Sequence, residues 1–155
     1  RGLRRVGFRF LGVRQEDVFR LHGRVAAVYA HPDGRVADVP LAGRLPGTYL
    51  LTLYDDGRGA LTRAGAGREV VVDRYRSTVV SVRATVSDLL LRHAESQAAL
   101  SLGRAPRVAT TLAERLALAE AWYREHARAE LLVPAAIEGM LFAGLLGFSV
   151  YLWLV

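Results

Sequence analysis

The chain has 155 residues, is 52% hydrophobic, carries a formal net charge of +6 and contains no cysteine. This length accommodates one modest domain plus a helix, and the absence of cysteine excludes disulfides, thiolate metal sites and a cysteine nucleophile. All 21 basic residues are arginines, which a GC-rich genome explains as well as any functional demand for guanidinium groups.

Residues 6–86 show the alternation of apolar and polar side chains that is typical of half-buried β-strands. Turn residues rich in glycine and proline separate these strands at 31–34, 45–48 and 55–59. About six or seven short strands at intervals of roughly ten residues predict a small antiparallel β-sandwich or barrel. The side chains expected in its core are Tyr29, Tyr49, Leu51, Leu53, Val70, Val72, Val80 and Val82.

The next segment, 87–133, follows a helical period and is predicted to form a helical hairpin or an amphipathic connector. Thr85 and Asp88 have the spacing of a helix start, because each can bond the backbone N–H of the other. The first helix is expected to continue until Gly103, which supplies a C-terminal stop.

A second helix is predicted to start at the capping box formed by Thr111 and Glu114 and to run toward Pro134, where a kink or break is expected. Trp122 on this helix either lies at the level of lipid headgroups or packs on the β-domain. The apolar stripe expected on the helix consists of Leu112, Leu116, Ala119 and Tyr123.

The last segment, 134–155, is predicted to be a transmembrane helix. Of the 21 residues from Ala135 to Val155, only Glu138 is charged and only Ser149 is uncharged and strongly polar. As a helix they would measure about 30 Å, the thickness of a bilayer core. A buried helix of a soluble domain usually alternates faces, whereas this segment is apolar all round.

Small residues recur at every fourth position of this predicted span, at Ala135, Gly139, Ala143 and Gly147. Their spacing predicts a helix-packing face, because a second helix backbone can approach closely there and close packing drives association in lipid. Glu138 adjoins this face one turn inside the span. Its carboxylate has three interpretations: it snorkels to the interface, contacts a partner helix, or relays protons or ions.

The sequence shows no pattern that points to catalysis, a cofactor or a metal. The stretch 65–70 lacks the third glycine of a dinucleotide-binding motif, and 147–149 lacks the closing glycine of a nucleophile elbow. Four histidines fall in separate elements without metal-ligand spacing: His22, His31, His93 and His126. We therefore expect no enzymatic activity, no cofactor and no metal site.

The arginines are spread along the chain, and only residues 1–14 form a clear basic cluster, with five arginines and no acidic residue. Nucleic acid is not expected as a partner, whereas anionic lipid headgroups or an acidic partner subunit would fit this cluster. Arg124 and Arg128, and farther back Arg115, precede the predicted span, and no basic residue follows it. The positive-inside rule then places the β-domain in the cytoplasm, or in the matrix or stroma of an organelle.

These features together predict an α+β membrane protein with an antiparallel β-domain at 1–86 and a single-pass membrane localisation. The favoured function is a non-catalytic, single-span subunit of a larger membrane protein complex, whose β-domain contacts partner subunits while its helix packs in the lipid bilayer. The alternative is a membrane-anchored sensor or adaptor that acts independently.

Overall fold

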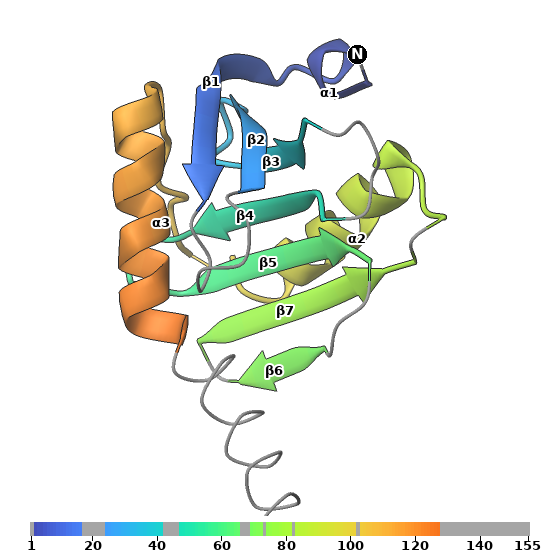
Figure 1. The fold of residues 1–155 in the computed structure, drawn as a ribbon. Helices are drawn as coiled ribbons and strands as arrows, with labels where there is room; N and C mark the ends of the chain where they lie inside the picture. The colour runs from blue at the N-terminus through green and yellow to red at the C-terminus, as the bar shows by residue number, and fades with distance from the viewer. Residues whose placement is uncertain are drawn as a thin grey trace, which may run out of the picture.

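The computed structural model describes residues 2–16, 24–41, 47–65, 69–72, 74–81, 83–101 and 103–127 (Figure 1). Its elements in chain order are α1 (Gly2–Arg5), β1 (Arg9–Glu16), β2 (Arg24–Ala30), β3 (Val36–Pro40), β4 (Tyr49–Leu53), β5 (Gly59–Ala64), β6 (Val70–Val72), β7 (Tyr75–Val80), α2 (Val86–Ala98) and α3 (Leu112–Ala127). The strands form one sheet in the order β1-β2-β3-β4-β5-β7-β6.

This sheet is mixed. Pairing is antiparallel from β1 through β5 and between β6 and β7, but β5 and β7 run parallel, with Gly59 opposite Tyr75 and Ala64 opposite Val80 (Figure 1). The predicted antiparallel sandwich or barrel was therefore wrong. In the described part of the chain the strands form a single sheet whose outer strands are β1 and β6. Strand spacing along the sequence does not reveal that β7 lies between β5 and β6.

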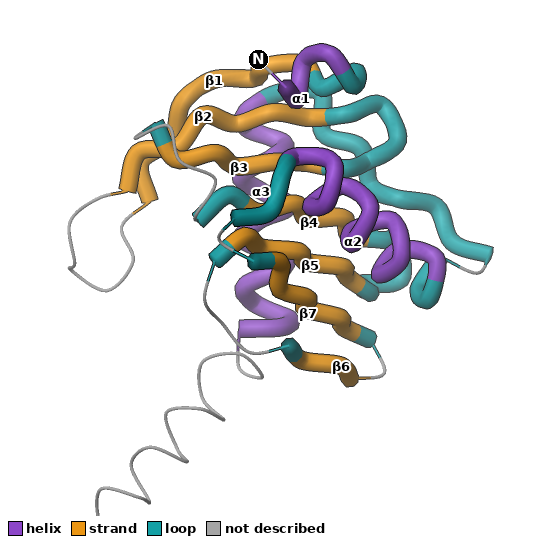
Figure 2. Tube along the Cα trace, turned by 90° about the vertical axis from the view of Figure 1, so that its right-hand side faces the viewer, coloured by secondary structure: helices purple, strands orange, loops and turns teal. Residues whose placement is uncertain are grey.

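Helices α2 and α3 lie on opposite faces of the sheet (Figure 2). Helix α2 packs mainly on β4, β5 and β7, where Leu89 joins Leu50 in one core cluster. On the other face Trp122 of α3 joins Leu51 and Leu53. Consecutive side chains of β4 are buried, which is typical of a strand with both faces covered. Here the two helices cover the two faces of one sheet, in place of the second sheet that was predicted.

The predicted core is confirmed for Leu51 and Leu53, which are both buried. Four more predicted core residues are partly buried and pack against the core clusters: Tyr29, Tyr49, Val70 and Val80. The side chains of Val72 and Val82 lie outside the described part of the structure.

Both predicted helix starts are confirmed. The Thr85 hydroxyl accepts from the Asp88 backbone N–H at 3.2 Å, and the Asp88 carboxylate accepts from the Thr85 N–H at 2.7 Å. Thr111 and Glu114 make the same reciprocal pair, with both distances 3.2 Å. Helix α2 ends at Ala98, before the predicted stop at Gly103.

The stripe that α3 presents to the sheet differs from the prediction. Arg115, Ala119 and Trp122 are buried, while Leu116 is 42% exposed. The reason is that Arg115 forms an ion pair with Asp38 of β3, which turns the charged side chain inward. Trp122 packs on Tyr75, with ring centroids 5.8 Å apart, so the second of its two predicted positions, packing on the β-domain, is the one observed.

The predicted transmembrane helix and single-pass membrane localisation are not supported. Across the described residues, no helix is both long enough and apolar enough to cross a bilayer. The longest of these helices, α3, has 16 residues, which corresponds to about 24 Å against the roughly 30 Å of a bilayer core, and it carries charged residues along its length. The segment 134–155 itself lies outside the described residues.

Candidate functional site

One buried charged cluster joins α3 to the sheet. The Asp38 carboxylate of β3 accepts from Arg115 Nη2 at 3.1 Å, from the Tyr49 hydroxyl at 2.8 Å, and from Arg14 Nε of β1. Asp38 is 1% exposed and Arg115 is fully buried. The guanidinium groups of Arg14 and Arg115 therefore share one carboxylate. Among the described residues, Nη1 of Arg115 has no hydrogen-bond acceptor. This geometry fixes α3, β1, β3 and β4 relative to one another.

A second buried polar cluster lies under α2. His93 is fully buried and its two ring nitrogens each lie 3.0 Å from a threonine hydroxyl, Nε2 from Thr52 of β4 and Nδ1 from Thr62 of β5. The Thr62 hydroxyl is in turn 2.8 Å from that of Thr78 on β7, which lies 3.2 Å from the Ser96 hydroxyl. The cluster thereby connects three strands to the helix.

The ionisation of His93 follows from its position. Burial, assisted by the positive charge of Arg35, lowers the pKa of His93 to about 3, so the ring is neutral at physiological pH. A general base must lie within hydrogen-bond reach of a substrate. A ring with no exposed surface cannot do so, and His93 therefore has a structural role.

A different kind of site lies on the surface. Helix α2 covers one face of the sheet at β4, β5 and β7, and the site lies on the same face at β1 to β3. Over β1 to β3 the same face presents four large apolar side chains to solvent: Phe10 (41% exposed), Val13 (48%), Val25 (39%) and Leu41 (56%). Strand register places them together, since Phe10 lies opposite Tyr29, Val13 opposite Ala27, and the Leu41 N–H bonds the Val25 carbonyl at 3.0 Å. We call these four residues, with the partly buried Tyr29 and Val39, the exposed sheet face.

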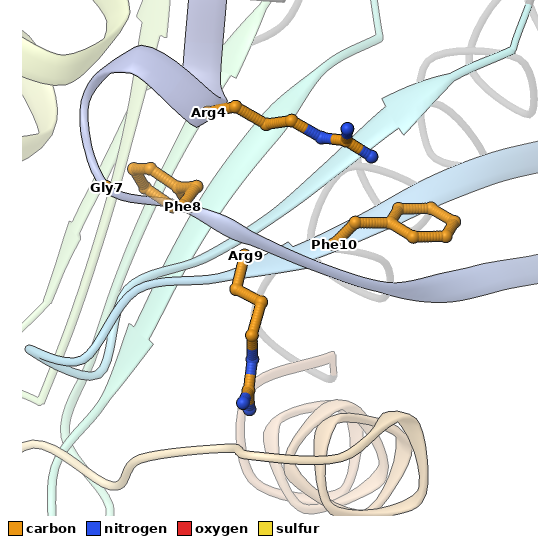
Figure 3. Close-up of a pocket in the computed structure, with 5 residues that line it drawn as sticks. All are labelled: Arg4, Gly7, Phe8, Arg9 and Phe10. Carbon is orange, nitrogen blue, oxygen red and sulfur yellow. The ribbon is translucent and has the colours of Figure 1, made fainter.

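A surface pocket of about 540 Å³ adjoins the exposed sheet face at its α1 end (Figure 3). It is lined by Arg4, Gly7, Phe8, Arg9 and Phe10. The guanidinium of Arg4 lies 5.8 Å from the centroid of the Phe10 ring, whereas Arg9 points to the other side of the strand and donates to the Thr110 carbonyl. The pocket therefore combines two aromatic rings with the positive charge of Arg4.

Arg4, Arg5 and Arg9 are all exposed. No described carboxylate forms an ion pair with any of them, whereas Arg14 in the same stretch is paired with Asp38. The α1 end of the exposed sheet face therefore carries a positive charge that the described residues leave unneutralised.

The residues predicted from the sequence as a helix-packing face, Ala135, Gly139, Ala143 and Gly147, and the polar residue Glu138 all lie outside the described residues. His31 and His93 lie in separate places, the β2–β3 turn and α2. In the part of the chain that is described, no group of three His, Asp or Glu side chains is arranged to hold a metal ion.

Sequence reasoning missed the exposed sheet face and both buried clusters. A signal for the His93 cluster was present, since Thr52 interrupts the otherwise apolar run 50–54, and a buried hydroxyl needs a partner. The exposed sheet face had no such signal, because an exposed valine and a buried valine look alike in an alternating strand.

Comparisons with protein families, with characterised proteins and with solved structures found no match for this chain.

Proposed function

We propose that this domain is a non-catalytic protein-binding module that holds a partner protein on the exposed sheet face. The observation that supports this is the grouping of Phe10, Val13, Val25 and Leu41, each 39–56% exposed, on one face of three adjacent strands. Single exposed apolar residues are normal on protein surfaces, but a contiguous patch is typical of an interaction site.

The sheet supplies a rigid base for such a site. β1, β2 and β3 are joined by antiparallel pairing, and the Asp38 cluster on their opposite face holds β1 and β3 to α3. A pre-organised apolar surface loses little conformational entropy when a partner binds, which favours affinity.

Site-specific photocrosslinking in cells of the source organism tests this proposal. A photoreactive amino acid replaces Val13 in the full chain, and the matched control carries it at Val71 of β6, which is 62% exposed at the other end of the sheet. We expect a discrete adduct with one protein from position 13 and none from position 71. An absence of adducts at 13, or the same adducts from both positions, would refute the proposal.

A further inference from the structure

We propose, building on the protein-binding function above, that the segment bound by the exposed sheet face is an acidic amphipathic helix. Its apolar side would pack on β1 to β3, and its carboxylates would lie against Arg4, beside Phe10 at the pocket. Helix-in-groove recognition of this kind uses apolar anchors at helical spacing for affinity and charge for selectivity.

The dimensions of the exposed sheet face fit one helix. From Tyr29 to Val25 the face extends about 13 Å along the strand, and three strands give a width of about 10 Å. A helix is about 10–12 Å across, and 13 Å of it contains about nine residues. A partner helix of two to three turns would therefore cover the face.

The layer structure of the domain supports a helix rather than another element. Helix α2, with 13 residues, packs on β4, β5 and β7 and forms a helical layer over that half of the sheet face (Figure 2). The other half, β1 to β3, exposes its apolar side chains. A partner helix there would lie beside α2 and complete the layer.

The charge of the surroundings selects the kind of helix. Arg4, Arg5 and Arg9 are exposed and form no ion pair with a described carboxylate. Arg4 lies over Phe10, a member of the exposed sheet face, so its charge is adjacent to the apolar surface. A helix with carboxylates near this end would neutralise the charge of Arg4, and one with basic residues there would be repelled.

Two synthetic peptides of about 14 residues provide the probe. Both carry leucines at helical spacing, and their remaining positions are mainly glutamate in one and arginine in the other. Fluorescence anisotropy measures the affinity of each for the full chain at about 50 mM salt, where screening is weak. We expect the acidic peptide to bind about fivefold more tightly, as a few exposed ion pairs would give.

Three variants test whether the preference for the acidic peptide arises at Arg4 and the exposed sheet face. Arg4→Glu should abolish it, while Arg83→Glu, which makes the same change of net charge at an exposed position after β7, should leave it unchanged. Val13→Asp should weaken the binding of both peptides at least tenfold, because it places a carboxylate within the apolar contact. Circular dichroism checks that each variant is folded.

The outcomes separate this inference from the proposed function. Equal affinity for the two peptides, with both lost in Val13→Asp, would refute the acidic helix and leave the protein-binding face in place. Acidic-peptide binding that depends on Arg4 but not on Val13 would refute docking on the exposed sheet face. If neither peptide binds the parent chain, the helical occupant is refuted, and crosslinking from position 13 then decides whether the face binds protein in another way.

Discussion

Protonation of His93 should destabilise the fold as pH falls. The pKa of this residue is about 3 in the folded chain because the ring is buried, and about 6.5 in the unfolded chain. Between these two values the unfolded state binds a proton that the folded state excludes, so the free energy of unfolding decreases as pH decreases. The stabilisation is fully present above pH 6.5 and is progressively lost down to about pH 3.

The magnitude follows from the two pKa values. Each pH unit below 6.5 removes about 1.4 kcal/mol, so the chain should lose about 2 kcal/mol of unfolding free energy between pH 8 and pH 5. Several carboxylates with lowered pKa values, such as Asp88 and Glu114, also lose stabilisation in acid, but their ordinary pKa values are already as low as 3.8 and 4.5. Their contribution therefore falls mainly below pH 5.

Urea unfolding followed by tryptophan fluorescence measures this effect at pH 8, 7, 6 and 5. The control is His93→Gln, whose amide can still bond a threonine hydroxyl but does not titrate, and which keeps the other three histidines. We expect the difference in unfolding free energy between the parent chain and the variant to shrink by about 2 kcal/mol from pH 8 to pH 5. A difference that is constant over this range would refute the assignment of a buried, neutral His93.

Two further predictions concern single contacts of the fold. Asp38→Asn should cost about 3–5 kcal/mol of unfolding free energy, because two buried guanidinium groups lose their carboxylate. Arg115→Met should cost less, because Asp38 keeps its ion pair with Arg14. Equal urea midpoints for the two variants would contradict this. Gly34→Ala should lower the melting temperature far more than Gly103→Ala. Both positions have positive φ, but a Cβ at 34 would lie 2.6 Å from Pro106 Cβ, whereas nothing lies within 4 Å at 103.

Local features of this chain could be predicted from the sequence. The two capping boxes were found because Thr85 and Asp88, like Thr111 and Glu114, interact within four residues of each other, so no knowledge of the fold was needed. The tight turn at 31–34 was equally local, with Gly34 at a φ of +85° and its N–H bonded to the His31 carbonyl at 3.0 Å.

Features that depend on distant residues could not be predicted in this way. Nothing in the neighbourhood of Arg115 indicates that it is buried, because its partner Asp38 is 77 residues away. The position of β7 between β5 and β6 and the exposure of Val13 are likewise set by the order of strands in the sheet. The interaction surface was therefore missed for the same reason as the topology.

The parallel pairing of β5 and β7 has a consequence for the order in which the sheet forms. Partners in β4 and β5 come as close as six residues along the chain, at Leu53 and Gly59, whereas every pair between β5 and β7 is 16 residues apart, as Gly59 and Tyr75 are. Closing a longer loop loses more chain entropy, and non-local pairing slows folding. Strands β6 and β7 should therefore join a meander of β1 to β5 that is already formed, and α2, the next element in the chain, then packs across the junction and stabilises it.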